Sequence, residues 1–218
     1  MKNGIIILVF LTFSCTLNKR EGATNDGVLF GGLFDFSSKK ELSPVDYISF
    51  IKENESGLTQ QFNSGDIIFS IKYLPQEFLT LKEVGTLSPS QAIFDSVLNS
   101  YGGMDYYSLS IKKATGNDNL LKYKETTISN YANRVEYYSF RASKDFKVIT
   151  LSDTNYCALH HFEQSYGVSP EVKILFGVKK DTLNASREIV FEDRVFEKGT
   201  IRVDFEASVF NSLPILKL

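Results

Sequence analysis

Apolar residues in the first half of the chain change between helical and strand spacing. Val45, Ile48 and Ile51 fall on one face of a helix. Ser43 precedes them as an N-cap residue, and Pro44 suits the first helical turn. By the same reasoning, a period of two favours strands at 66–73 and 107–111, and a period of 3.6 favours helices at 76–84 and 89–101.

Strand patterns dominate the second half of the chain. Residues 120–141 are ambiguous, because their apolar positions fit a helix while residues 135–140 also alternate; we favour the helix. Further strands are expected at 146–151, 158–162, 172–178, 187–191 and 201–205. The last of these predict an antiparallel meander. The whole pattern predicts an α+β fold, mostly antiparallel β in a sandwich-like or meander sheet, with two to three short helices in the N-terminal half.

The first fifteen residues differ from the rest of the chain. A short basic start is followed by an almost wholly apolar run at 5–13, and then by Ser14 and Cys15. Such a run is too short to span a bilayer, which needs about 20 residues. A charged start, an apolar centre and a small residue at the end are typical of a secretory signal.

The stretch Leu11-Thr12-Phe13-Ser14-Cys15 resembles the cleavage region of bacterial lipoprotein signal peptides. In that family a small residue precedes an invariant Cys, and Leu usually stands three residues before it. Here Thr12 holds that position, which gives a relaxed, Bacteroidota-like version of the motif. The resemblance implies cleavage between Ser14 and Cys15 and a lipid on Cys15. An ordinary secretory signal, or an N-terminal membrane anchor, is the alternative.

This resemblance sets the expected organisation and location of the chain. Residues 1–14 would be a signal peptide, 15–43 a lipidated Cys with a polar tether, and 44–218 one globular domain. We expect the protein in the cell envelope, held to the membrane by its N-terminal lipid, in the outer membrane rather than the inner one. In overall style the body also resembles small envelope lipoproteins of Bacteroidota, from which no specific role follows.

Composition narrows the function classes. With 24 basic and 26 acidic residues the formal net charge is −2, which argues against a nucleic-acid partner. Two Cys and two His leave little material for a structural zinc site or a disulfide framework, and we expect no metal and no cofactor. If Cys15 carries a lipid, Cys157 is the remaining thiol, and we expect it to be a buried small hydrophobic residue.

We assign no catalytic residue from the sequence. His160 and His161 are adjacent on a predicted strand and therefore point to opposite faces, one to the core and one to solvent. No nucleophile elbow, phosphate loop or zinc-protease motif occurs. The carboxylates cluster in two places where solvation explains them, Asp204 with Glu206, and Glu192 with Asp193 and Glu197.

Aromatic residues are the candidate binding groups. Where two Tyr are adjacent on a strand, one ring faces outward, so Tyr106 or Tyr138 is a candidate exposed anchor, although core packing explains most of the tyrosines. Phe34, in the apolar stretch 29–36, is a third candidate for binding. Thr182, in a predicted turn, resembles an acceptor for O-glycosylation in exported Bacteroidota proteins.

Three functions fit these observations. The first is a non-catalytic binding or assembly subunit of the envelope, with an envelope protein as a candidate partner. The second is an enzyme acting on an envelope polymer or glycan, which would need a cleft where carboxylates, or a carboxylate and His160 or His161, converge. The third is a structural surface antigen. We favour the first.

Overall fold

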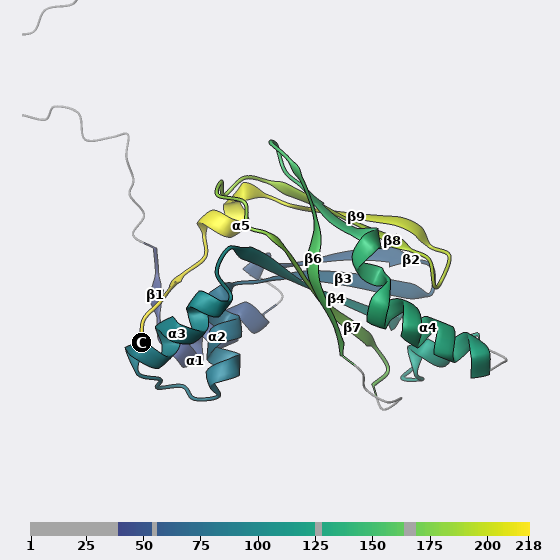
Figure 1. The fold of residues 1–218 in the computed structure, drawn as a ribbon, viewed down its shortest axis with the longest axis horizontal. Coiled ribbons are helices and arrows are strands. Elements are labelled where there is room, and N and C mark those ends of the chain that lie inside the picture. The colour runs from purple at the N-terminus through teal and green to yellow at the C-terminus, as the bar shows by residue number, and fades with distance from the viewer. Residues whose placement is uncertain (1–38, 54–55, 125–127, 164–168) are drawn as a thin grey trace, which may run out of the picture. The chain divides into compact units, whose positions relative to one another are not determined.

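The computed structural model describes residues 39–53, 56–124, 128–163 and 169–218 (Figure 1). Its helices are α1 (Pro44–Lys52), α2 (Gln76–Val84), α3 (Gln91–Ser100), α4 (Ile128–Phe140) and α5 (Ala207–Asn211), with 3₁₀ helices η2 (Leu120–Lys122) and η3 (Ala142–Asp145). Its strands are β1 (Glu41–Leu42), β2 (Thr59–Ser64), β3 (Ile67–Leu74), β4 (Met104–Lys113), β5 (Phe146–Ile149), β6 (Thr154–Glu163), β7 (Val172–Lys179), β8 (Arg187–Asp193), β9 (Gly199–Phe205) and β10 (Ile215–Leu216). The predicted α+β class with mostly antiparallel strands is confirmed.

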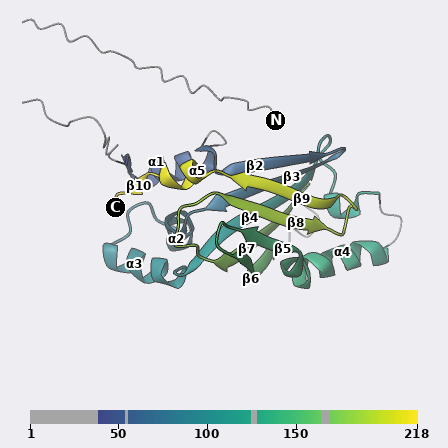
Figure 2. The ribbon, with the colours of Figure 1, turned by 90° about the horizontal axis from the view of Figure 1, so that it is seen from above.

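Eight of these strands form one antiparallel sheet in the order β2-β3-β4-β7-β6-β5-β8-β9. β2 and β9 are the two edges of the described sheet, yet the sheet curls until they lie side by side (Figure 2). An ion pair joins the two edges, because Lys198 Nζ, after β8, lies 3.0 Å from Asp66 Oδ1, between β2 and β3. The sheet is therefore close to a barrel, with its concave face toward the core.

The core is built from the inward-facing side chains of the curled sheet. In β3 every second side chain from Ile67 to Tyr73 is buried, as the period-two pattern predicts. Across the sheet, Phe146 of β5 and Phe176 of β7 stack with their ring centroids 4.2 Å apart. Burying one Phe side chain contributes roughly 1.5–3 kcal/mol, so this aromatic interior is a main source of stability.

The helices gather at the two ends of the sheet. α1, α2 and α3 lie together at one end, and α4 lies at the other (Figure 1). The predicted cap of α1 is confirmed, since the Ser43 hydroxyl accepts from the Asp46 backbone N–H at 3.3 Å. α2 ends at Gly85, whose φ of 71° is a left-handed conformation that glycine adopts without strain. The helix favoured within 120–141 is present as α4.

Three features of the fold differ from the sequence predictions. β2 was not predicted, because its sequence TQQFNS is polar and it sits at a sheet edge. The last strands are not a simple meander, since β8 pairs with β5 rather than with β7. Residues 41–42, expected in the tether, form β1 and pair in parallel with β10.

In the ranges that the structure describes, no helix has both the length and the apolar character needed to cross a membrane.

Candidate ligand pocket

A pocket of about 530 Å³ lies where one end of the sheet meets helices α1, α2 and α3. Its walls come from segments far apart in the chain, namely Lys39 before β1, the three helices, the strands β3, β4 and β8, the loop between β7 and β8, α5 and β10. Apolar side chains make much of the lining: Tyr47, Tyr73, Pro75, Phe94, Leu98, Phe210, Leu213, Pro214, Ile215, Leu216 and Leu218. A concave, partly apolar pocket with a few converging polar groups is the usual form of a small-molecule site.

A buried ion pair lines this pocket. Arg187 Nη1, at the start of β8, lies 2.8 Å from Asp105 Oδ2 on β4, and each side chain is only 2% exposed. Arg187 Nη1 also donates to the Tyr107 hydroxyl at 3.0 Å, and the Tyr73 hydroxyl donates to Asp105 Oδ1 at 3.2 Å. The backbone N–H of Asp181 donates to Asp105 Oδ2 at 3.1 Å. The Asp105 carboxylate is thus held by three donors.

The electrostatic environment keeps the two phenols of this network neutral. Burial raises the pKa of Tyr73 far above its usual range, and the adjacent Asp105 charge raises it further. Burial likewise raises the pKa of Tyr107, although the neighbouring Arg187 charge works in the opposite direction. Both groups therefore act as hydrogen-bonding hydroxyls at physiological pH.

The guanidinium of Arg187 has N–H groups that no described residue accepts. Its Cζ lies over the Phe210 ring, 4.1 Å from the ring centroid, and is 5.8 Å from the centroid of the Tyr73 ring. Within the described part of the chain, both of its side-chain hydrogen bonds come from Nη1, and Nε is buried without an acceptor. Unpaired buried donors are uncommon and call for an explanation such as a bound group or ordered water.

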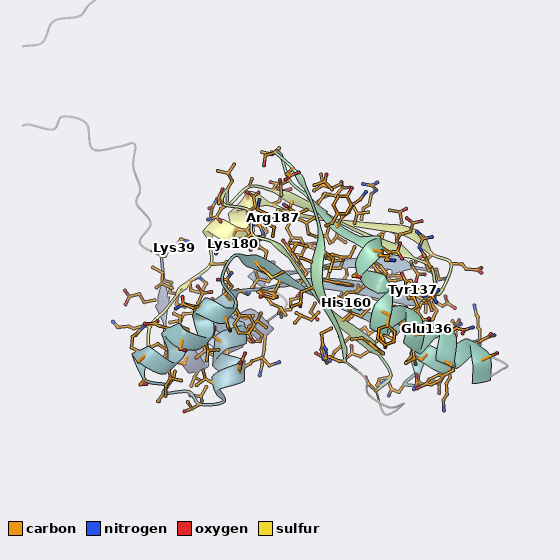
Figure 3. All side chains as sticks on the ribbon, viewed as in Figure 1. Lys39, Glu136, Tyr137, His160, Lys180 and Arg187 are labelled. Carbon is orange, nitrogen blue, oxygen red and sulfur yellow. The ribbon has the colours of Figure 1, made fainter. Side chains whose placement is uncertain are left out.

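Two lysines and two carboxylates also line the pocket. Lys39 precedes β1 and Lys180 follows β7, and both line the pocket with Arg187 (Figure 3). The helical wall carries Glu77 and Asp95. Lys39 and Lys180 make no ion pair with any residue in the described ranges.

One wall of the pocket is lightly held. β1 and β10 pair over two residues each, through the Ile215 N–H to the Lys40 carbonyl and the Lys217 N–H to the Leu42 carbonyl, both at 2.9 Å. An exposed ion pair between Lys217 and Glu41 adds little. Segments with few buried contacts open at a low free-energy cost, so this is the wall that can yield to an entering molecule.

The predicted aromatic anchors are not exposed. Tyr106 is 4% exposed and Tyr138 is fully buried, so the expectation of an outward ring in solvent is wrong for both. Tyr106 does point to the convex face, but Tyr101 covers it with ring centroids 5.4 Å apart. Tyr138 lies inside the sheet against Phe162. Phe34, Ser14 and Cys15 lie outside the described residues.

The two histidines behave as the strand pattern predicts. His160 is half-buried, with Nε2 2.9 Å from the Ser139 carbonyl oxygen, and His161 on the opposite face is exposed. Figure 3 shows His160 and Tyr137 near α4, apart from Arg187. Neither histidine lines the pocket. They therefore add no acid–base group to it.

The carboxylate clusters separate into solvated and structural groups. Asp204 and Glu206 are exposed as expected. The prediction of solvation is wrong for Asp193, which is 4% exposed and accepts from the backbone N–H groups of Val195, Phe196 and Lys198. Asp193 thus holds the β8–β9 turn together. Among the described residues, no three metal-ligating side chains converge on one point.

Cys157 and Thr182 do not line the pocket. Cys157 is half-buried against the core rather than fully buried, and burial raises the pKa of its thiol to about 11. Thr182 is exposed in the loop between β7 and β8.

The central pair of the site, Asp105 and Arg187, was missed from the sequence. Arg187 shares the inward face of its strand with Ile189 and Phe191, and Asp105 shares one with Tyr107. A charged residue at an inward-facing strand position could have indicated a buried ion pair, because a buried charge needs a partner. Comparisons with protein families, with curated proteins and with solved structures gave no match.

Proposed function

We propose that this protein is a lipid-anchored protein of the cell envelope, whose body binds a small ligand in the pocket beside Arg187 and Asp105. One observation carries the binding role: a buried arginine with unused donors lies among aromatic side chains in the lining of a pocket. Buried charges cost several kcal/mol in desolvation. A site that keeps one beside a pocket is a candidate for recognition of a polar group.

The anchor is a separate part of the same proposal. The signal-like residues 1–14 and the relaxed motif before Cys15 support a lipid at that residue, and the polar stretch after it supports a tether. Lys39, which lines the pocket, falls within this predicted tether.

Fatty-acid labelling tests the anchor. Cells expressing the full chain are fed a fatty-acid analogue, and wild type is compared with Cys15→Ser and with Cys157→Ser as the matched control. We expect labelled protein in the membrane fraction for wild type and Cys157→Ser, and no label for Cys15→Ser. Equal labelling of all three, or of none, would contradict the anchor.

Native mass spectrometry tests the pocket. The protein is released from the envelope in mild detergent and weighed intact, and Leu98→Trp is used to fill the pocket. Ile93→Trp is the control, because Ile93 lies on the same helix but is 55% exposed and outside the lining. We expect a non-covalent adduct on wild type and Ile93→Trp that Leu98→Trp lacks. An adduct on all three would place the ligand elsewhere.

A second candidate function, assembly with an envelope protein, rests on a different observation. Leu151 is 87% exposed and Tyr156 is 67% exposed, and both belong to the β5–β6 hairpin. Exposed apolar groups on one hairpin fit a protein contact. Cross-linking in intact envelopes tests this, and Leu151→Ser with Tyr156→Ser should remove any cross-linked product without changing the pocket adduct.

A further inference from the structure

We propose that the pocket takes a small organic carboxylate, whose carboxylate group accepts hydrogen bonds from the Nε and Nη2 side of Arg187. This deepens the proposed function and rests on it, since it names the chemistry of the ligand in the same pocket.

The free edge of Arg187 matches a carboxylate. Nη1 is already used by Asp105 Oδ2 and the Tyr107 hydroxyl. This leaves the N–H groups of Nε and Nη2, for which no described residue provides an acceptor. Those two nitrogens form one edge of a planar fork, and a planar carboxylate is the group that pairs with such an edge through two parallel hydrogen bonds.

The lining carries as many basic side chains as acidic ones, namely Arg187, Lys39 and Lys180 against Asp105, Asp95 and Glu77. Asp105 is occupied by Arg187, and Asp95 Oδ1 accepts from Gln91 at 2.8 Å on the helical wall. Lys39 and Lys180 are not neutralised by any residue in the described ranges, as shown above. The two lysines would favour the approach of an anion, whereas Glu77, which also lines the pocket, would oppose it.

The rest of the pocket favours an organic anion over a bare inorganic one. Tyr73 and Phe210 pack on the guanidinium, and Phe94 and Leu98 face the same space. Flat apolar surfaces of this kind gain by covering the carbon skeleton of a ligand. The volume of about 530 Å³ also exceeds what one inorganic anion would fill.

Entry is possible through the lightly held wall. Arg187 is 2% exposed, so a ligand reaches its free edge only if a neighbouring segment moves. The β1–β10 pair, with its two backbone hydrogen bonds, borders the pocket through Ile215 and Leu216. A bound ligand would hold this wall in place, and its backbone N–H groups would then exchange more slowly.

The test observes Arg187 directly by NMR. The arginine Nε–H signals of the full chain are recorded, and the Arg187 signal is assigned from Arg187→Lys. The probes are benzoate, its neutral isostere benzamide, and inorganic phosphate. We expect benzoate to shift the Arg187 signal in a saturable way and to slow amide exchange in residues 40–42 and 215–217, while benzamide does neither.

Variants give the expected size of the effect. Lys180→Ala should weaken benzoate binding about two- to fivefold, the range for one exposed ion pair. Lys112→Ala, on the exposed outer face of β4, is the matched control and should bind as wild type does. Arg187→Lys should weaken binding by at least about tenfold, because the bidentate edge is lost. If Arg187→Lys does not fold, the benzoate titration of the wild type and of Lys180→Ala still shows whether the pocket binds a carboxylate.

Each other outcome overturns the proposal. An Arg187 signal that benzoate does not move at millimolar concentration would mean that ordered water satisfies the free edge. Equal shifts with benzamide would show that the ring and not the charge is recognised. Equal saturation by phosphate would show a general anion site. In these cases a native adduct that Leu98→Trp removes would leave the proposed function standing.

Discussion

Arg187 Nη1 and Asp105 Oδ2 are 2.8 Å apart, although 82 positions separate the two residues in the chain. β4 and β8 are not neighbours in the sheet, so the pair joins two strands across the interior of the curled sheet. Each charge satisfies the other, and Tyr73 and Tyr107 add hydrogen bonds. The same contact therefore fixes the end of the barrel-like sheet and places a charged group at the pocket.

Breaking this pair should destabilise the protein strongly. Asp105→Asn leaves the Arg187 charge buried without its counter-charge, and we expect the free energy of unfolding to fall by about 3–5 kcal/mol in urea titrations. Glu188→Gln is the control, because the Arg202–Glu188 pair is partly exposed and should be worth less than about 1 kcal/mol.

The double variant Asp105→Leu with Arg187→Met should be more stable than Asp105→Asn alone. Removing both charges leaves no unpaired buried ion. A double variant as unstable as the single one would show that the network contributes through shape rather than charge.

Stability should decline in alkali. Burial raises the pKa of Tyr107 and Tyr138 in the folded protein, while unfolded phenols titrate near about 10. Below that pH both states hold their protons. Above it the unfolded state loses protons first, so the free energy of unfolding falls as the pH rises.

Near-ultraviolet absorbance of the phenolate checks this prediction. The buried tyrosines should ionise only together with loss of the native circular dichroism signal. In urea all tyrosines should titrate in one step. A single reversible step in the native protein would contradict the burial of these rings.

Adding a methyl group at Gly177 should disturb the convex face of the sheet. A Cβ there would lie 2.8 Å from Met104 Cε and 3.4 Å from a ring carbon of Tyr106. We expect Gly177→Ala to cost no more than about 1 kcal/mol, the low end of the range for overpacking, because the flexible Met104 side chain can move aside. Met104→Ala should recover part of that loss, since the tightest contact is with the end of its side chain, and strict additivity in a double-mutant cycle would refute the contact.

The thiol of Cys157 should react slowly while the protein is folded. Burial raises its pKa to about 11, so at pH 8 it should be alkylated on the order of a hundredfold more slowly than an ordinary thiol. Iodoacetamide labelling of Cys15→Ser, followed by intact mass, measures this one thiol. The urea-unfolded protein is the control and should react at the ordinary rate.

The sequence predicted most elements in which one face meets the core, although α5, which buries Phe210, was not predicted. The strict alternation of β3 is an example, because burial of one face imposes its period on the residues. The helix α1 and its cap were predicted, but its buried side chains are Tyr47 and Ile51, and Val45 of the predicted face is 53% exposed. β2 escaped prediction because an edge strand needs no continuous apolar face. The pairing of β8 with β5 also escaped, since strand order depends on contacts between distant segments.

The candidate site was beyond reach for the same reason. Arg187 and Asp105 each stood in a predicted strand, but nothing local in the chain indicates that they meet. For the tyrosines, the sequence predicted exposure that the structure does not have. Tyr106 was correctly placed on the outer face of its strand, but the sequence could not show that Tyr101 covers it.

An experimental structure of the full chain purified from its own envelope tests the central claim most directly. We expect a bound molecule in the pocket, with an acceptor oxygen within hydrogen-bond distance of Arg187 Nε or Nη2 and its carbon skeleton against Phe94 and Phe210. A pocket that holds only ordered water, or that is closed by the chain's own side chains with the Arg187 donors satisfied, would contradict it.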